Sequence, residues 1–369
     1  MNDSERKYHV NKILSDTTGY VEDITEEDKK KADKYRADIE EYNLKSEYHR
    51  AKDFYTDIKN SINKPYIPTG FYNLDQELDG GLKEGIYFIG AISSLGKTTF
   101  CLQLAYQMAR QNQDVLFISL EQSANELRAK SISRNTYILS GVSKHLAKSA
   151  NIITDYEKIS KFNEFEKELY FNALSLYREE SRNLFIIESV YNYGVKELEE
   201  DIKKHIDFRN KKPVVFIDYV QILSPINDRY TDKQNTDRTV TNLRRLARDN
   251  HLTIFGISSF NRDNYNNPVT MTAFKESGAI EYSSDVLIGL QPQGLQFAKN
   301  NTEKEENRKI IEECKLSDER YIELVILKNR NGRTGGKVFF KFIPKYNYFE
   351  ETDKHEEERE EVKQETIFT

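Results

Sequence analysis

The sequence predicts an α/β fold: a mostly parallel central sheet flanked by helices, preceded by a short helical extension. Two observations predict it. Short apolar segments alternate with polar or helical segments from Ile67 to Glu350, as in chains whose parallel strands are joined by helical crossovers. One such segment, 86–89, leads into a loop of small residues and then into helical periodicity over 100–111. This order of strand, loop and helix is typical of P-loop proteins, which bind a nucleoside triphosphate.

Composition predicts a soluble, intracellular protein. The chain has 369 residues, of which 37% are hydrophobic, and its 23 tyrosines and 20 phenylalanines can fill a core. Its apolar runs are too short for a transmembrane segment or a signal peptide, so the predicted location is the cytoplasm. The two cysteines, Cys101 and Cys314, show neither a disulfide framework nor a metal-binding spacing.

The acidic excess lies at the C-terminal end of the chain. The formal net charge is -6, and residues 350–369 hold nine acidic and three basic residues. Residues 351–369 are therefore predicted to be a solvated, disordered tail. Basic residues gather at 321–349, and a cluster of this kind on one surface is compatible with DNA binding.

Residues 1–65 form the predicted N-terminal extension. They are highly charged and show no strand pattern, but apolar residues recur at spacings of three and four, namely Tyr48, Ala51, Tyr55, Ile58 and Ile62. That spacing predicts an amphipathic linker helix over 46–63 with one apolar stripe. Two interpretations stay open: the stripe packs on the chain's own domain, or it docks on a neighbouring subunit.

Residues 66–350 are predicted to form the α/β domain. Its predicted strands are 86–90, 115–120, 184–188, 214–218, 252–258, 285–290, 322–328 and 337–342. Residues 125–205 are expected to be mostly helical. The polar residues 291–320 are expected to form a surface excursion.

The phosphate-binding loop reads Gly-Ala-Ile-Ser-Ser-Leu-Gly-Lys-Thr-Thr from Gly90 to Thr99. Loop amides and the helix N-terminus would surround the phosphates, Lys97 would reach the terminal ones, and the Thr98 hydroxyl would ligate Mg²⁺. The usual spacing has a glycine five residues before Gly96, where this chain has Ala91. The predicted nucleotide-binding residues are Ser93, Ser94, Gly96, Lys97, Thr98 and Thr99.

Two carboxylates follow predicted strands of the same domain. Asp218 closes the segment 214–218, and Glu121 follows the segment 115–120. Ligands of parallel sheets bind at the carboxyl ends of the strands, so Asp218 is predicted to hold a water of the Mg²⁺ shell. Glu121 suits the general base that activates the attacking water. The alternatives are a helix-capping or turn role for Asp218 and a solvated position for Glu121.

A second basic segment, Lys328-Asn-Arg-Asn-Gly-Arg333, lies between two predicted strands. The segment predicts a hairpin with Lys328 and Arg330 near its base. Alternating residues of an extended chain share one face, so these two cations should point together. Either the hairpin is merely solvated, or both cations reach a phosphate that a neighbouring subunit binds.

Seven segments occur in an order that resembles one known family. They are 69–75, the phosphate-binding loop, 119–121, 217–223, 258–262, 275–281 and 328–332. The series is similar to the C-terminal motor domain of the DnaB-type replicative DNA helicases, which has a RecA-like fold, and it covers about residues 66–350. RadA-like and KaiC-like ATPases share the fold and the first motifs. The segments 275–281 and 328–332 favour the helicases.

The resemblance implies an ATP-dependent DNA helicase of replication that uses ATP and Mg²⁺. It implies a hexameric ring in which Lys328 and Arg330 reach the γ-phosphate bound to the next subunit. The implied catalytic residues are Lys97, Glu121, Lys328 and Arg330, and the implied metal-site residues are Thr98 and Asp218.

The resemblance also implies contacts with single-stranded DNA in the central channel. The residues concerned are Lys275, Glu276, Gly278 and Arg262. Backbone contacts of this kind tolerate any sequence and weaken as salt rises. The family moves 5′ to 3′ on the strand that it encircles. A helicase loader or a primase is an implied partner, and a membrane is not.

Three features depart from the family pattern. Ser259 stands where the family usually has a Gln that senses the γ-phosphate, and Lys275 stands where Arg is usual. Residues 1–64 are too short and too charged to resemble the family's N-terminal collar, which docks primase. A phage, plasmid or mobile-element relative without the collar would show this pattern. Two other functions stay open: a RadA- or KaiC-like recombination or repair ATPase that binds DNA without unwinding it, and a nucleotide-dependent scaffold.

Overall fold

The computed structural model describes residues 26–61, 66–189, 192–261, 266–274 and 278–352. The chain divides into two compact units, residues 1–65 and residues 66–369. Among the helices in the described ranges, none is long and apolar enough to cross a membrane. The predicted tail, 351–369, lies outside these ranges except for its first two residues.

The described part of the first unit is helical. It contains α2 (Glu26–Leu44), α3 (Glu47–Arg50) and α4 (Phe54–Ser61). The predicted helix over 46–63 falls on α3 and α4, which a turn at residues 51–53 separates. Tyr48, Tyr55 and Ile58 of the apolar stripe are exposed.

The second unit is built on a nine-stranded sheet with the order β3-β2-β4-β5-β1-β6-β7-β8-β9. The strands are β1 (Gly85–Ala91), β2 (Val115–Ser119), β3 (Leu184–Glu188), β4 (Val214–Asp218), β5 (Thr253–Ser259), β6 (Val286–Pro292), β7 (Arg320–Asn329), β8 (Lys337–Ile343) and β9 (Tyr348–Thr352). The strands from β3 to β6 in this order are parallel. The strands from β6 to β9 are antiparallel. All eight predicted strands are present, and β9 was not predicted.

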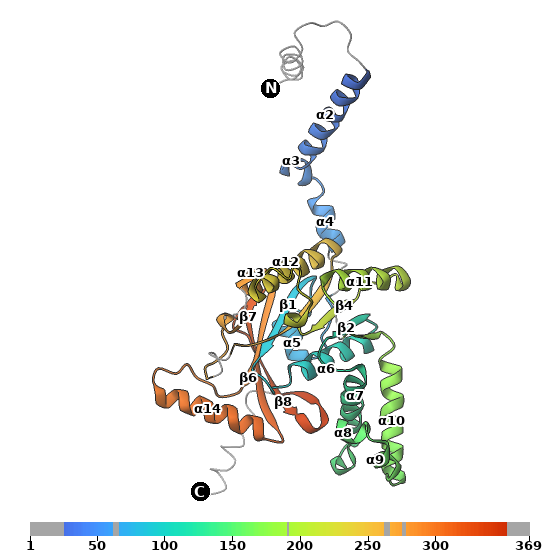
Figure 1. Ribbon diagram of the computed structural model, residues 1–369, viewed down its shortest axis with the longest axis vertical. Helices are drawn as coiled ribbons and strands as arrows, with labels where there is room; N and C mark the ends of the chain where they lie inside the picture. Colours follow the sequence, from blue (N-terminus) through green and yellow to red (C-terminus); the bar gives the residue numbers. More distant parts are fainter. Residues whose placement is uncertain (1–25, 62–65, 190–191, 262–265, 275–277, 353–369) are drawn as a thin grey trace. The chain divides into compact units, whose positions relative to one another are not determined.

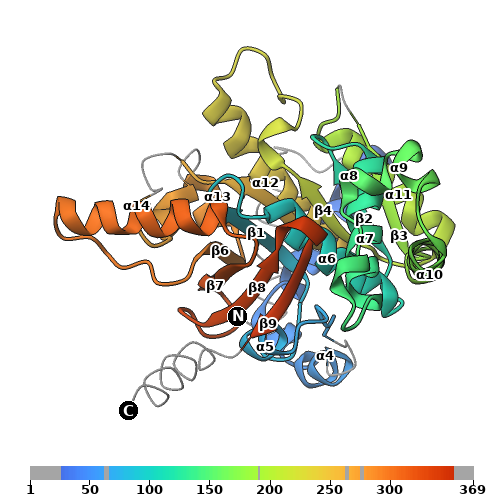
Figure 2. The same ribbon diagram turned by 90° about the horizontal axis from the view of Figure 1, so that it is seen from below.

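Helices cover both faces of the sheet (Figures 1 and 2). The α-helices in the described part of this unit are α5 (Tyr72–Glu77), α6 (Lys97–Arg110), α7 (Ala124–Leu139), α8 (Ala150–Ile153), α9 (Tyr156–Ser160), α10 (Glu164–Glu180), α11 (Val195–Arg209), α12 (Asp232–Asn250), α13 (Gly278–Ser283) and α14 (Asn301–Leu316). Crossovers between parallel strands are right-handed, so the strand order sends α6, α7 and α10 to one face and α11, α12 and α13 to the other. α6, α7 and α10 contact one another, and α12 contacts both α11 and α13.

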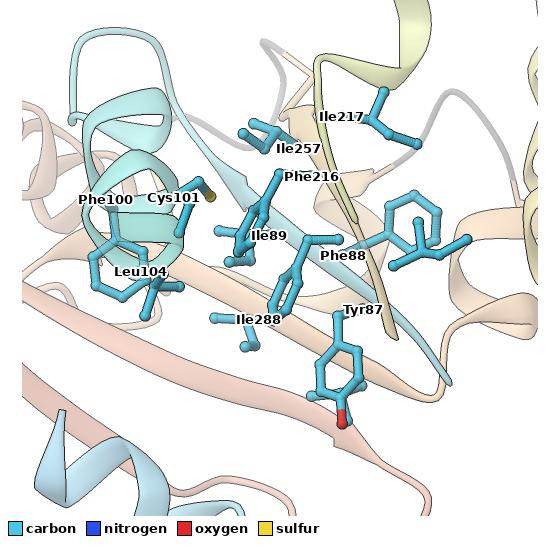
Figure 3. Packing of buried hydrophobic residues seen from close by; sticks show 14 of the residues in the cluster. Tyr87, Phe88, Ile89, Phe100, Cys101, Leu104, Phe216, Ile217, Ile257 and Ile288 are labelled. Atoms are coloured by element: carbon cyan, nitrogen blue, oxygen red, sulfur yellow. The ribbon is translucent and has the colours of Figure 1, made fainter. Parts of the chain in front are cut away.

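The core of the domain lies where β1, β4 and β5 meet the helices (Figure 3). The rings of Phe216 and Phe255 stack with centroids 4.6 Å apart, and Tyr87 stacks on Phe255 at 4.8 Å. These strands are buried along almost their whole length, because helices cover both sides. A continuous apolar core therefore fixes the ends of the strands that carry the candidate site.

The predicted excursion at 291–320 contains a helix of its own, α14. It begins at Asn301, whose preceding residue Asn300 caps it by accepting a hydrogen bond from the Glu303 amide at 2.9 Å. In both ribbon views α14 lies on the opposite side of the domain from α7 and α10 (Figures 1 and 2). The sequence did not predict this helix, because the segment is polar and the helix buries only a narrow face, which includes Asn307 and Ile311.

Candidate nucleotide-binding site

The phosphate-binding loop connects β1 to α6 in the way that the sequence predicts. Ser94 and Gly96 both have positive φ, at 70° and 87°. A side chain at Gly96 would meet the Phe342 ring at 2.8 Å, so both the backbone angle and the available space call for glycine. The loop ends at the N-terminus of α6, where backbone amides without helical partners favour an anion.

Lys97 is folded back over this loop. Its ammonium donates to the Ala91 carbonyl at 3.1 Å and to the Ile92 carbonyl at 3.4 Å. Burial lowers the pKa of Lys97, and the charges of Asp218 and Glu121 oppose that effect. The ammonium therefore has weak backbone partners, which phosphate oxygens can replace.

Asp218 lies at the same edge of the sheet as the loop. It pairs in register with Ser119 of β2, and its carbonyl accepts from the Leu120 amide at 2.8 Å. This pairing places Glu121, one residue further on, beside the same edge. The predicted group of Lys97, Thr98, Glu121 and Asp218 is thus brought together, because all four lie at or beyond the carboxyl ends of parallel strands of one sheet.

The Asp218 carboxylate is buried and only partly paired. It is 1% exposed, and the Thr98 hydroxyl hydrogen-bonds to it. Its Oδ2 atom has no hydrogen-bond partner among the described residues. Burial raises the pKa of Asp218 to about 6; the Thr98 hydrogen bond lowers it and the Glu121 charge raises it further. An orphaned carboxylate oxygen beside a hydroxyl fits a hydrated Mg²⁺ ion.

Thr99 and the two serines at the end of β5 have a less direct relation to the candidate nucleotide site. Thr99 is buried in the first turn of α6, although the sequence places it among the nucleotide-binding residues. Ser258 accepts a hydrogen bond from the Gln221 side chain at 2.8 Å, and Ser259 is the last residue of β5. Gln221 lies three residues after the end of β4, so this bond links the segments at the ends of two neighbouring strands.

Sequence reasoning missed two cations near the phosphate loop. Lys130 of α7 donates to the Gln122 side chain at 2.7 Å and is close enough to Asp218 to lower its pKa. Arg320, the first residue of β7, donates to the carbonyl of Ser94 at 2.6 Å. No spacing rule connects residue 320 with residue 94, so only the fold could reveal this contact.

Lys328 and Arg330 lie at the opposite edge of the sheet. β7 runs antiparallel to β6, and its Asn329 pairs with Val286 at the start of β6. Lys328 donates to the Glu281 carbonyl at 2.5 Å, and Arg330 donates to the Tyr282 carbonyl at 3.2 Å. The two cations do point together, as predicted, toward the C-terminal end of α13.

An ion pair with Asp285 also holds the Arg330 guanidinium at this opposite edge. Its Nη1 atom lies 3.3 Å from the Asp285 carboxylate, whose backbone amide donates to the carbonyl of Ile86 at the start of β1. β7, whose first residue Arg320 contacts the loop, has ten residues and spans about 30 Å. Arg330 is therefore far from the phosphate loop of its own chain.

Most of the predicted DNA-binding residues lie outside the described ranges. These are Arg262, Lys275 and Glu276. Gly278 is described, and it is the first residue of α13. Lys328 of β7 and Arg330, the residue after β7, thus both contact the helix that follows the predicted DNA-binding loop.

The strand order, with a phosphate loop after β1 and a buried aspartate at the end of β4, defines a RecA-like P-loop nucleotide-binding domain. Residues 66–351 match the model of the DnaB-like helicase C terminal domain family. The chain belongs to this family, as the motif series predicted.

Curated relatives of this chain are replicative helicases. "Replicative DNA helicase DnaB" of Helicobacter pylori (strain ATCC 700392 / 26695) is 26% identical over 348 residues, which cover 87% of this chain and 67% of the relative. The same protein of strain J99 is 26% identical, with 83% and 64% covered. "Probable replicative DNA helicase" of Trieres chinensis is 25% identical, with 79% and 59% covered. The chain thus spans about 59–67% of the length of these relatives.

Solved structures share the fold. One, described as an ATPase domain, superposes with a TM-score of 0.66 at 22% identity, covering 84% of this chain and 99% of that one. "The Structure Of A DnaB-Like Replicative Helicase And Its Interactions With Primase" gives a TM-score of 0.65 at 22% identity, with 82% and 66% covered. Both comparisons support the RecA-like arrangement of sheet and helices.

Proposed function

We propose that this chain is the motor subunit of a ring-shaped DNA helicase that acts in replication in the cytoplasm. In this proposal ATP is hydrolysed at the interfaces between subunits, and the ring, a hexamer, moves 5′ to 3′ on single-stranded DNA. The observation that carries the proposal is the separation of two half-sites on one domain. The phosphate loop and its acids lie at one edge of the sheet, and Lys328 and Arg330 lie at the other.

The first half-site suits binding of a nucleoside triphosphate with Mg²⁺. Lys97 would exchange its bonds to the Ala91 and Ile92 carbonyls for bonds to phosphate oxygens. Thr98 and Asp218 would hold the ion or its waters. When bound, Mg²⁺ neutralises charge on the phosphates. Glu121 would orient the attacking water and take its proton.

The second half-site suits a phosphate on another subunit. Arg330 is exposed, and within the described ranges its guanidinium contacts one carbonyl and one carboxylate, so it can turn toward an incoming anion. A guanidinium beside the γ-phosphate stabilises the charge of the transition state. An interface that joins one edge of a subunit to the opposite edge of the next is heterologous, and such interfaces form a ring when the rotation between successive subunits closes.

DNA contact would fall to the segment before α13. Lys275, Glu276 and Gly278 would touch the DNA backbone, and Arg262 would add charge nearby. Because Lys328 and Arg330 contact α13, nucleotide and DNA sites of adjacent subunits would meet at this helix. A primase or a helicase loader is the expected protein partner, since one solved relative is described with its interactions with primase.

Unwinding of a forked DNA with a 5′ single-stranded tail tests this function. We expect strand separation that requires ATP and Mg²⁺ and that falls as salt rises, because the DNA contacts are mainly ionic. Lys97→Ala should abolish both unwinding and hydrolysis. Hydrolysis that DNA stimulates without any strand separation would instead favour an ATPase that binds DNA without unwinding it. Slow ATP hydrolysis whose rate DNA does not change would favour a nucleotide-dependent scaffold.

A further inference from the structure

Arg320 lies at the end of β7 that faces the chain's own phosphate loop. The last register pair of β6 and β7 joins Pro292 to Ile322, and β6 runs parallel to β1. Arg320 is therefore at the edge of the sheet where the loop begins. Its Nη1 atom donates to the Ser94 carbonyl at 2.6 Å, across 226 residues of sequence. This contact is tertiary and involves the loop itself.

A second set of contacts holds the guanidinium in place. Its Nη2 atom donates to the Lys315 carbonyl at 2.6 Å, in the last turn of α14. The guanidinium carbon lies 5.9 Å from the centre of the Phe342 ring, and Phe342 stacks on Phe349 at 4.1 Å. The same Phe342 ring fills the space beside Gly96. Arg320 and the phosphate loop thus both pack against the Phe342 ring.

Arg320 forms no ion pair with the residues that the structure describes. Among the described residues no carboxylate lies within ion-pair distance of it, and the neighbouring Glu319 pairs with Lys341 at 2.9 Å. Its two shortest contacts go to backbone carbonyls instead. A charged donor on a carbonyl makes a stronger hydrogen bond than a neutral one.

The Ser94 carbonyl is a sensitive point of the loop. Ser94 has a φ of 70°, a region that residues with a side chain rarely occupy. The peptide that joins Ser94 to Leu95 is planar and trans, so its carbonyl and its amide point in opposite directions. Holding the carbonyl of Ser94 therefore also fixes the direction of the Leu95 amide, in the part of the loop that would surround the phosphates.

We propose that Arg320 is a positioning residue of the nucleotide site. It holds the Ser94 carbonyl, keeps the loop in its phosphate-binding conformation and so slows the release of nucleotide. This inference rests on the proposed function of the loop as a nucleotide site. β7 then serves two sites, with Arg320 acting on its own subunit and Arg330 on the next.

Dissociation of a fluorescent ADP from the full chain tests the role of Arg320. Arg320→Met keeps the length and packing of the side chain but removes its donors, and we expect release about tenfold faster, in line with the loss of a charge-assisted hydrogen bond. Arg320→Lys keeps the charge but has a single donor nitrogen, so it should recover part of the slow release. Arg308→Ala, an exposed arginine of α14 that pairs with Glu312, should match the wild type.

The outcomes separate this inference from the proposed function. Melting of the nucleotide-free chain shows whether a variant folds, and Arg320→Ala replaces Arg320→Met if that variant does not. Release at the wild-type rate from a folded Met or Ala variant would overturn the positioning role and leave the proposed function intact. Equal acceleration by the Lys and Met variants would also overturn it. No ADP binding by the wild type would overturn both.

Discussion

Asp218 is a carboxylate that the nucleotide-free chain stabilises poorly. It is 1% exposed, and burial raises its pKa to about 6 from an ordinary value of 3.8. At a pH between these two pKa values, the carboxyl of Asp218 binds more protons in the folded chain than in the unfolded chain. The contribution of Asp218 to stability therefore decreases as the pH rises through this window. A site built to receive a cation has this property before the cation binds.

We predict that Asp218→Asn stabilises the nucleotide-free chain at pH 7.5 and abolishes hydrolysis. The gain should be about 1–3 kcal/mol, because one pKa unit corresponds to roughly 1.4 kcal/mol. It should shrink as the pH falls from 7.5 to 4.5, since the wild-type carboxyl then takes up its proton. Urea unfolding across this pH range measures it, with the exposed Asp228→Asn as the control.

A gain that is absent at pH 7.5, or that grows as the pH falls, would contradict the raised pKa of Asp218. Hydrolysis that survives the change would contradict its place beside Mg²⁺. The two readouts are independent, because the first is measured without nucleotide.

At the scale of residues, sequence could predict what lies close to a motif. Lys97, Thr98, Glu121 and Asp218 follow the ends of strands, and parallel strands bring such residues to one edge. Lys130 and Arg320 could not be predicted in the same way. Lys130 reaches the acids from the second turn of α7, and Arg320 reaches the loop from the start of a distant strand.

At the scale of elements, β9 supports the nucleotide site indirectly, through hydrogen bonds to α5 and α6. The side-chain amide of Gln103 in α6 pairs with the backbone of Phe349 as a neighbouring strand would. It donates to the Phe349 carbonyl at 2.8 Å and accepts from the Phe349 amide at 2.9 Å. Glu351 of β9 accepts from the Asn73 and Leu74 amides at the start of α5. The last strand thus ties α5 and α6 to the sheet.

We predict that Gln103→Leu destabilises the domain by about 1–3 kcal/mol. Leucine fills a similar volume but leaves the buried amide and carbonyl of Phe349 without partners, and that desolvation is the main cost. Urea unfolding of the full chain measures the change. Gln111→Leu, at the exposed C-cap of the same helix, is the matched control and should lie within about 0.5 kcal/mol of the wild type. Equal effects of the two variants would show that β9 does not depend on α6.

The last strand, β9, escaped prediction for a physical reason. Tyr348–Thr352 is short and runs into an acidic stretch, so its composition is that of a solvated tail. It becomes a strand because β8 and the Gln103 side chain supply partners for its backbone. The strands β1, β2, β4, β5 and β6 needed no such help, since apolar segments buried on both faces are visible in the sequence.

At the scale of the whole molecule, β7 spans the domain between two candidate sites. Arg320 contacts the phosphate loop at one end, and Lys328 and Arg330 contact α13 at the other. A subunit that uses both ends for catalysis needs a neighbour on each side. The family resemblance alone suggested a ring, and the strand directions now supply a structural argument for shared sites.

We predict that mixing two inactive variants restores hydrolysis. Lys97→Ala lacks a working phosphate loop but keeps Arg330, and Arg330→Ala lacks the arginine but keeps the loop. In a one-to-one mixture about a quarter of the interfaces would pair an intact loop with an intact arginine, if subunits join at random through heterologous contacts. ATP hydrolysis by the mixture should therefore exceed that of either variant alone, and nucleotide binding by Arg330→Ala should stay near the wild-type level. A mixture no more active than its components, under conditions in which the subunits exchange, would mean that Arg330 acts within its own chain or not at all.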